Sequence, residues 1–242
     1  MHLCIDQGNT STKIAFFSDR LTVHHAVLED TTLLNDVAAL VEKYNPEHVL
    51  LSTVRADYSA LHHLLKQYAE VTVLVAETAL PFAIDYESPQ TLGADRKANA
   101  AAAISEFGRG NIVIVDCGTC ITYTIVTDSI LRGGAISPGI RMRLLALHQY
   151  TGRLPHLTPK NEVPAAIGSS TEGSIRAGVE LATLLEVEKM TEQYCSEMTD
   201  PIVIFTGGAS SYFVQHIKSR IFARPFLTLS GLHEILLHNL SL

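Results

Sequence analysis

The sequence lacks the features of membrane, secreted and nucleic-acid-binding proteins. No apolar run among its 242 residues approaches the roughly 18 residues that a membrane-spanning helix needs. The chain does not open with a basic segment followed by an apolar one, so we expect no signal peptide and a cytoplasmic location. The 18 lysines and arginines are scattered and are outnumbered by 25 aspartates and glutamates, which gives a formal net charge of -7. This negative charge argues against a phosphate-backbone partner such as DNA.

Cysteines are few, at positions 4, 117, 120 and 195. Cys117 and Cys120 form a CxxC pair, which elsewhere serves as a redox pair or as half of a zinc site. No second CxxC or HxxxH supplies the two missing zinc ligands, and the pair follows a strand and does not open a helix. We interpret both cysteines as small buried residues near a turn, in a protein of a reducing compartment.

Several catalytic motifs are also absent. Neither GxxxxGK[ST] nor GxGxxG occurs, so a P-loop or a Rossmann site has no signature here. No GxSxG occurs, so a serine hydrolase has no support. The segment HEILLH, residues 233–238, spaces its histidines differently from the zinc motif HExxH, and we predict a surface helix there.

The apolar residues that are present predict an α/β protein whose elements run twice in a similar order. The first series is a strand at 1–5, a hairpin over 13–28, a helix at 31–45, a strand at 48–54, a helix at 57–69, a strand at 71–76 and an alanine-rich helix at 94–107. The second is a strand at 111–115, a hairpin over 121–136, a helix opened by Pro138, a long helix at 171–195 capped by Thr171 or a neighbour, a strand at 202–208, a helix at 210–220 and a last helix with Ser230 as cap.

Each series contains an Asp-x-Gly turn directly after its first strand. Superposing Asp6 on Asp116 also pairs Gly8 with Gly118, Asn9 with Thr119 and Thr12 with Thr122. Internal similarity of this kind indicates a duplication. We therefore predict an N-terminal domain over 1–112 and a C-terminal domain over 113–242, packed tightly around a shared cleft because no Pro/Ser-rich linker separates them.

The chemistry of the two turns suits a polyphosphate. Glycine allows close approach of a backbone, and Asn9, Thr10, Ser11 and Thr119 offer N–H and O–H donors for phosphate oxygens. Asp6 and Asp116 lie at strand ends, where a carboxylate can hold hydrated Mg²⁺ or another cation. Lys13 either reaches a phosphate or points to solvent. The alternative is a pair of ordinary Asp-Gly turns with local hydrogen bonds.

A third glycine site lies at the end of the strand predicted at 202–208. Gly207 and Gly208 leave bare backbone against which a flat ring such as adenine can lie. A Gly-Gly pair is also common in ordinary strand-to-helix turns.

The pattern of Asp-x-Gly-Asn-Thr, Asp-x-Gly-Thr and strand-Thr-Gly-Gly resembles the acetate kinase, sugar kinase, Hsp70 and actin superfamily. Within it, the chain is most similar to the type III pantothenate kinase family, from Asp6 to about Gly208. The resemblance rests on DQGNTSTK, on Tyr86 and Pro89 in DYESPQTLGADR, on GADR at 93–96, and on DCGTCIT, GGAISPGIRMRLLAL, TEGSIRAG and FTGG in family order.

This resemblance implies a duplicated ribonuclease-H-like fold, as in actin-like ATPases, with mixed sheets flanked by helices. It also implies a homodimer and ATP-dependent phosphorylation of pantothenate, the first step toward coenzyme A. Asp95 would be the catalytic base, and Asp116 would hold a monovalent cation, K⁺ or NH₄⁺, beside Mg²⁺ near Asp6. The residues implied to bind ATP are Asp6, Gln7, Gly8, Asn9, Thr10, Ser11, Thr12, Lys13, Thr119, Gly207 and Gly208. Those implied to bind pantothenate are Tyr86, Gly93, Ala94, Asp95, Arg96 and Thr171.

The residues of GADR leave alternatives open on their own. Asp95 lies at a helix start, where a carboxylate often serves only as a cap. Arg96 either pairs with a substrate carboxylate or phosphoryl group, or forms a surface salt bridge. The chain departs from the family at Cys120, usually alanine, and at Ser170, usually asparagine; the second departure touches fine substrate contacts and not the reaction type.

Two other functions remain as alternatives to pantothenate phosphorylation. One is a kinase or phosphatase of the same superfamily with another small substrate. The other is a catalytically silent regulatory or accessory protein. The second alternative predicts loss of GADR or of a turn aspartate, and both are intact here.

Overall fold

The computed structural model describes all 242 residues of the chain. Two compact units are present: residues 1–108 together with 226–242, and residues 109–225. The predicted domains, 1–112 and 113–242, differ from this division mainly at the end of the chain, because the last helix packs in the first unit.

The first unit is a mixed sheet between two pairs of helices. Its strands are β1 (His2–Gln7), β2 (Thr12–Ser18), β3 (Leu21–Leu28), β4 (His48–Thr53) and β5 (Glu70–Val73). The short strand β6 (Ala83–Ile84) is not part of this sheet. Its helices are α1 (Leu33–Tyr44), α2 (Ser59–Leu65), α3 (Ala94–Phe107) and α8 (Leu227–Leu240), with a 3₁₀ turn at Pro89–Thr91. The sheet order is β3-β2-β1-β4-β5, in which β1, β2 and β3 are antiparallel and β4 and β5 run parallel to β1.

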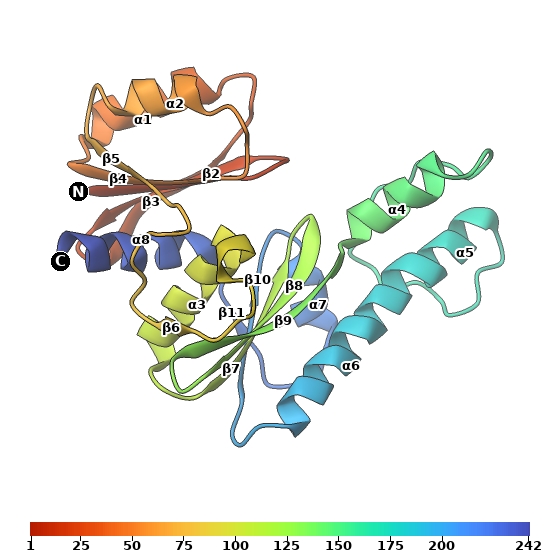
Figure 1. Cartoon of the computed structure of the whole chain (residues 1–242). Helices are drawn as coiled ribbons and strands as arrows, with labels where there is room; N and C mark the ends of the chain where they lie inside the picture. The colour runs from red at the N-terminus through yellow and green to blue at the C-terminus, as the bar shows by residue number, and fades with distance from the viewer. The chain divides into compact units, whose positions relative to one another are not determined.

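Successive residues of these strands face different helices. Leu3 and Ile5 pack with residues of α1 and α2, whereas Cys4, Ala15 and Leu50 pack with residues of α3 and α8. Figure 1 shows the two helix pairs on opposite faces of this sheet. Because side chains of a strand alternate between faces, this arrangement also fixes the side on which each polar residue at the strand ends lies.

Helices α3 and α8 approach each other very closely. A side chain at Gly231 of α8 would overlap the carbonyl oxygen of Ala98 in α3. Ala98 and Ala101 of α3 pack with Leu232 and Ile235 of α8 in one core cluster. This close approach explains the alanine-rich sequence of α3, since larger side chains would separate the two helices.

The prediction of a surface helix for HEILLH was wrong. His233 is only 2% exposed, and its ring stacks on Phe17 with the ring centres 4.2 Å apart. Its Nε2 lies 3.0 Å from Nδ1 of His2, so one ring donates a hydrogen bond to the other. The helix also starts earlier than predicted, at Leu227, because the buried Leu227 and Leu229 extend its apolar face; Ser230 lies inside the helix and is not its cap.

The second unit repeats the arrangement of strands. Its elements are β7 (Asn111–Cys117), β8 (Cys120–Thr127), β9 (Ile130–Pro138), α4 (Ile140–Gln149), α5 (Thr171–Arg176), a π-helical segment (Ala177–Leu181), α6 (Ala182–Ser196), β10 (Ile202–Thr206), α7 (Ser210–His216) and β11 (Phe222–Ala223). Within this unit the order β9-β8-β7-β10-β11 matches β3-β2-β1-β4-β5. The pair directions match as well, so the α/β class with two mixed sheets and the internal duplication are both confirmed.

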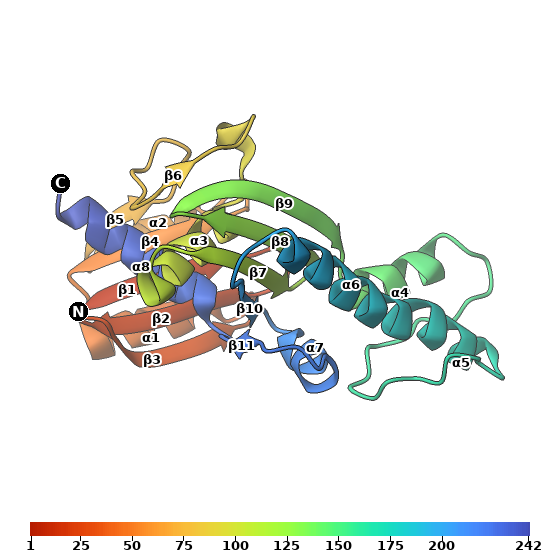
Figure 2. The same ribbon diagram turned by 90° about the horizontal axis from the view of Figure 1, so that it is seen from below.

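The core of the second unit lies between one face of its sheet and helices α4 to α7. Val115, Cys117, Tyr123 and Phe205 contribute to it from the strands. Figure 2 shows α5, the π-helical segment and α6 as one long helix that runs beside α4. The predicted hairpin turn is present at Asp128 and Ser129, which both have positive φ, as a two-residue turn of this kind requires.

One helix start in this unit differs from the prediction, and the predicted cap of the long helix, Thr171 or a neighbour, is confirmed. Pro138 is the last residue of β9 and does not open α4, because Gly139 is extended and the helix begins at Ile140. The long helix is capped by Ser170, whose hydroxyl oxygen accepts a hydrogen bond from the Gly173 N–H at 3.1 Å. No helix of either unit combines the length and the apolar character that a membrane crossing requires.

The buried His233 predicts a pH-dependent stability. Burial, with smaller contributions from nearby positive groups, lowers its pKa from 6.5 to about 4, so the ring is neutral in the native chain while the unfolded chain binds a proton below pH 6.5. The free energy of unfolding should therefore fall by about 3 kcal/mol from this residue between pH 6.5 and pH 4.

Urea denaturation at several pH values measures this slope. His233→Phe keeps a stacked ring without a titrating group and should flatten the slope over that window. The control is His63→Gln at an exposed position of α2, which should retain the wild-type slope. Identical slopes for wild type and His233→Phe would contradict the assignment.

Candidate active site

The first Asp-Gly turn joins β1 to β2 at the edge of the first sheet. Asp6 and Lys13 are opposite each other in the two strands. Asp6 follows Cys4 by two residues and Lys13 precedes Ala15 by two, so both side chains lie on the face that α3 and α8 cover. Gln7 points to the other face, where its amide oxygen accepts a hydrogen bond from the Thr53 hydroxyl at 2.8 Å, and its backbone carbonyl accepts from the Val54 N–H at 3.2 Å.

The tip of this turn exposes its polar groups. The Gly8 N–H donates to the Ser11 carbonyl at 3.1 Å, which closes the turn, while Asn9 and Thr10 are exposed. A side chain at Gly8 would lie 3.3 Å from that same carbonyl oxygen. Thr12, by contrast, is fully buried, and the structure gives its hydroxyl no hydrogen-bond partner.

Arg55 is a residue of this region that the sequence analysis missed. Its Nε donates to the Gly8 carbonyl at 3.1 Å, and its guanidinium pairs with Asp30 at 2.7 Å. Arg55 thereby fixes the turn from the end of β4. Its position just after the strand neighbouring β1 was the available signal, but the pairing of β1 with β4 is known only from the fold.

GADR forms the start of α3. The N-cap residue is Gly93, which has no side chain, and Asp95 lies in the first turn of the helix, where its carboxylate faces the positive end of the helix dipole. The Asp95 carboxylate folds back over Gly93, where any side chain would overlap its Oδ1. Arg96 is 3% exposed and its guanidinium lies 5.6 Å from the centre of the Tyr86 ring, which also excludes a surface salt bridge as its main role.

The second Asp-Gly turn has Asp116 between two threonines on neighbouring strands. Thr206 of β10 and Thr122 of β8 are its direct partners in register. All three side chains lie on the sheet face opposite the helix-covered core, because Cys117, Tyr123 and Phe205 occupy the other face. Both threonines are buried, and the structure gives the Thr122 hydroxyl no hydrogen-bond partner.

The glycine pair after β10 lies against this turn. Gly207 has φ +88°, and a side chain there would overlap Oδ1 of Asp116 and come within 2.7 Å of the Cys117 backbone. The Ala209 N–H donates to the Cys117 carbonyl at 2.9 Å. The structure therefore brings together Asp116 and Gly207 of the predicted site, which are 91 residues apart in the sequence.

Gly139 completes the surroundings of the second turn. Its N–H donates to the Thr119 carbonyl at 3.0 Å, and a side chain there would lie 2.6 Å from the carbonyl oxygens of Gly118 and Thr119. Thr119 itself is exposed at the tip of the turn. Only glycine allows the segment after β9 to lie this close to the turn.

The two turns differ in length, which corrects the predicted superposition. Asp6 is opposite Lys13, whereas Asp116 is opposite Thr122. The first turn is therefore one residue longer, and Thr122 corresponds structurally to Lys13 and not to Thr12. An alignment without a gap concealed this shift, because both turns contain Asp-x-Gly and a threonine six residues after the aspartate.

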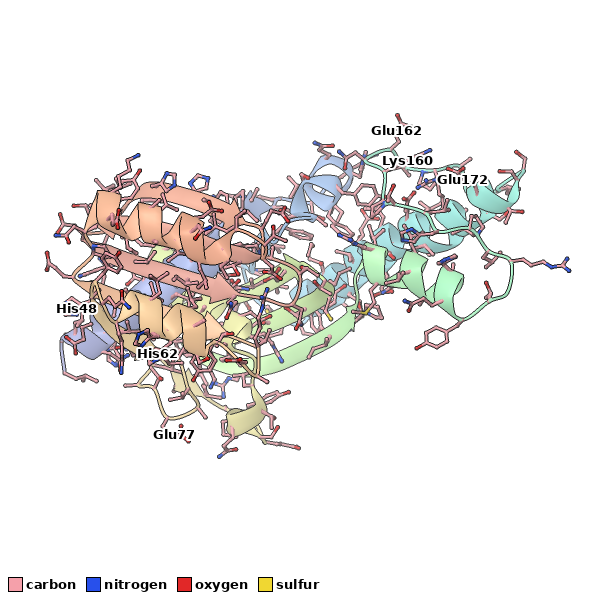
Figure 3. All side chains as sticks on the ribbon, turned by 90° about the horizontal axis from the view of Figure 1, so that it is seen from above. His48, His62, Glu77, Lys160, Glu162 and Glu172 are labelled. Carbon is pink, nitrogen blue, oxygen red and sulfur yellow. The ribbon has the colours of Figure 1, made fainter.

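Thr171 is the first residue of α5 in the second unit. It lines a groove of about 910 Å³ between α4 and α5, with apolar neighbours such as Leu147, Ile175 and Val179. On the other side of α5, Glu172 pairs with Arg176 at 2.8 Å and with Lys160 at 3.3 Å, and Figure 3 shows Lys160 beside Glu172. These contacts hold the loop before α5 to the helix that presents Thr171.

Of the CxxC pair interpreted as buried, Cys117 is fully buried but Cys120 is only half-buried. All four cysteines are unpaired, and burial raises the pKa of the Cys117 thiol well above the usual value. No group of three or more histidine, cysteine, aspartate or glutamate side chains is arranged to hold a metal ion. A cation at Asp116 or Asp6 would therefore also need hydroxyl, carbonyl, water or phosphate oxygens as ligands.

Comparison with known proteins decides the family. The model of the type III pantothenate kinases matches residues 2–193. The chain belongs to the type III pantothenate kinase family. It is 39% identical to a type III pantothenate kinase of Christiangramia forsetii over 241 residues, 99% of each chain, and 40% identical to one of Bacteroides fragilis over 242 residues, 99% of this chain and 98% of the relative.

Solved structures agree on the fold of this type III pantothenate kinase. A conserved Baf family protein from Campylobacter jejuni superposes with a TM-score of 0.65 at 21% identity, over 99% of this chain and 100% of the other. The ethanolamine utilization protein EutJ from Carboxydothermus hydrogenoformans gives 0.53 at 14% identity, over 96% and 89%. These neighbours confirm an actin-like ATPase fold for the kinase.

The contrast between the two adjacent glycines after β10 gives a test of this geometry. Gly207→Ala introduces a side chain at positive φ and into the Asp116 carboxylate, and should lower the free energy of unfolding by about 1–3 kcal/mol. Gly208→Ala meets nothing within 4 Å and should stay within about 0.5 kcal/mol of wild type.

Urea denaturation of both variants checks this difference. Equal stabilities would contradict the close approach of Gly207 to Asp116. If Gly208→Ala is as stable as wild type, a change in its affinity for ADP reports on contact between the nucleotide and that backbone.

Proposed function

We propose that this chain transfers the γ-phosphoryl group of ATP to the primary hydroxyl of pantothenate, giving 4'-phosphopantothenate and ADP, the first step of coenzyme A synthesis. The observation that carries this is the start of α3. There the family's GADR is intact, and the Asp95 carboxylate lies over Gly93 in the first turn of the helix. The family match over residues 2–193 supports the same reaction.

Asp95 acts as the base. The pantothenate hydroxyl oxygen forms the new bond to Pγ, the bond from Pγ to the bridging oxygen of ADP breaks, and the hydroxyl proton passes to the Asp95 carboxylate. An aspartate is a weak base, but phosphoryl transfer depends mainly on positioning and on charge neutralisation. The buried Arg96, held beside the Tyr86 ring, supplies positive charge next to this carboxylate for the pantothenate carboxylate or the moving phosphoryl group.

The two turns bind ATP. The backbone N–H groups of residues 9–11 and the hydroxyls of Thr10 and Ser11 suit phosphate oxygens, with Asn9 and Thr10 exposed and Ser11 half-buried, and Lys13 on the same sheet face as Asp6 adds a positive charge. Thr119 at the tip of the second turn offers further donors, and the bare backbone of Gly207 and Gly208 suits the adenosine part. The side chains of Gln7 and Thr12 are buried, so these two residues contribute by holding the turn between their paired strands.

Asp116 holds the monovalent cation, K⁺ or NH₄⁺. The row formed by Thr206, Asp116 and Thr122 fits a weakly charged ion, because it combines one carboxylate with two buried hydroxyls. The unpartnered Thr122 hydroxyl supports this assignment, since a buried hydroxyl without a partner is unfavourable. Asp6 is the residue we assign to Mg²⁺, through water; the bound ion would neutralise charge on the ATP phosphates.

Pantothenate contacts Tyr86, Gly93 to Arg96, and Thr171. The groove that Thr171 lines is mostly apolar, and Tyr150 at its edge is 87% exposed. We propose that a second copy of the chain covers this groove in a homodimer, in keeping with the family resemblance. The departure at Ser170 has a structural role here, because its hydroxyl caps α5 next to Thr171.

A coupled assay of ADP release tests the function. Purified protein with ATP, Mg²⁺ and K⁺ should release ADP only when pantothenate is added, and a panel of other small alcohols and acids should be poor substrates. ADP release with another member of the panel would establish a different substrate. No release with any of them would favour the regulatory alternative.

Asp95→Asn sharpens this test. The variant should lose turnover by a factor of about 10²–10⁴, the usual contribution of a general base, while it binds ATP as wild type does in calorimetry. Arg109→Gln serves as the control, at an exposed position after the end of α3, and should keep wild-type turnover. Near-normal turnover of Asp95→Asn would remove Asp95 from its role.

The cation assignment gives a separate prediction. Replacing K⁺ by Na⁺ should reduce turnover, and Thr122→Val should raise the K⁺ concentration for half-maximal activity about 10-fold, equivalent to about 1.4 kcal/mol of binding. The control Thr127→Val removes a hydroxyl from the far end of the same strand and should leave K⁺ dependence unchanged. Equal K⁺ dependence in wild type and Thr122→Val would exclude that hydroxyl as a ligand.

A further inference from the structure

Arg143 at the start of α4 forms a two-pronged ion pair with Glu186 of α6. The two guanidinium nitrogens lie 2.7 Å and 2.8 Å from the two carboxylate oxygens. Ser137 joins the pair, because its hydroxyl donates to Glu186 at 2.8 Å and accepts from Arg143 at 3.2 Å. Paired geometry of this kind is among the strongest and most directional of side-chain interactions.

The same arginine also binds the backbone between β9 and α4. Its Nε donates to the Pro138 carbonyl at 2.7 Å, so all three donor nitrogens of the guanidinium are engaged. Ser137 and Pro138 are thus both fixed by Arg143, and Gly139 follows them directly. A lysine could not make these contacts together, because it has a single nitrogen.

This backbone segment contacts the second Asp-Gly turn. The Gly139 N–H donates to the Thr119 carbonyl at 3.0 Å, in a contact too close for any side chain. A continuous path of short contacts therefore runs from Glu186 through Arg143 and Pro138 to Thr119. Asp116 lies three residues before Thr119, in the strand that ends at this turn.

Charge and burial make the pair persistent at neutral pH. The side chains are 22% and 32% exposed, so solvent screens the pair only in part. Hydrogen bonding from Arg143, followed by that from Ser137, holds the pKa of Glu186 below its usual value despite partial burial. Arg143 also lines the groove that contains Thr171, so the same side chain borders two predicted parts of the site.

We propose that Arg143, fixed by Glu186, is a positioning residue for the ATP-binding turn at Gly118 and Thr119. It sets the position of Gly139, which in turn sets the Thr119 backbone. The inference rests on the proposed function, in which that turn binds ATP. A residue that merely joins α4 to α6 would affect stability alone, whereas a positioning residue changes the affinity for nucleotide.

Kinetics of matched variants separate these roles. Arg143→Ala should raise the KM for ATP by about 10- to 100-fold, as expected when a binding group is displaced by an ångström or less. Arg143→Lys should restore the charge and most of the thermal stability but not the KM for ATP. Glu186→Gln should give an intermediate KM, because the amide retains only part of the pairing.

Val187→Ala is the control for stability. Val187 is fully buried in the same helix, next to Glu186, and it is not part of the path to the turn. This variant should lower the thermal midpoint about as much as Arg143→Ala does, while its KM for ATP stays within about 2-fold of wild type. If Arg143→Ala behaves like Val187→Ala, the positioning role is overturned.

Calorimetry with ADP alone distinguishes this failure from a failure of the proposed function. Wild type that binds ADP and turns over pantothenate, with an Arg143→Ala variant that binds ADP equally well, contradicts only the positioning role. Wild type that does not bind ADP contradicts the proposed function itself, and with it the role of Arg143. Loss of ADP affinity in Arg143→Ala and in Arg143→Lys, but not in Val187→Ala, supports the inference.

Discussion

The row of Thr206, Asp116 and Thr122 is the constraint on which the second unit's polar site depends. It places one carboxylate between two hydroxyls on three neighbouring strands, on the sheet face opposite the core. A slip of one residue in either pairing would turn a threonine to the other face and put a core side chain beside Asp116. Two glycines complete the surroundings of this row. Gly207 and Gly139 lie so close to the turn that no side chain fits between them and its backbone.

The local parts of this arrangement were predictable from the sequence. Apolar runs that end in Asp-x-Gly gave the two turns, and GADR before an alanine-rich run gave the start of α3. The row of Thr206, Asp116 and Thr122 was not predictable, because Thr206 and Asp116 become neighbours only through the parallel pairing of β10 with β7. Arg143 and Arg55 were missed for a similar reason. Each acts on a turn through a backbone carbonyl of another segment, and a sequence pattern does not show which carbonyl a long side chain reaches.

The two units have the same strand order but differ in their turns. The first turn is one residue longer and has Lys13 opposite its aspartate, whereas the second has Thr122 there. A lysine opposite Asp6 brings positive charge to that end of the sheet, and a threonine opposite Asp116 leaves room and oxygen for an added cation. The duplication therefore preserved the scaffold while the residue opposite the aspartate set the electrostatic character of each turn.

The return of α8 to the first unit affects the order in which the chain can fold. The face of the first sheet formed by Cys4, Ala15 and Leu50 is covered jointly by α3 and α8, and α8 follows the whole of the second unit in the chain. During synthesis, this apolar face stays incompletely covered until residues 227–240 have left the ribosome. The second unit, continuous in sequence, has no such delay, so the half made later can complete its core before the half made first.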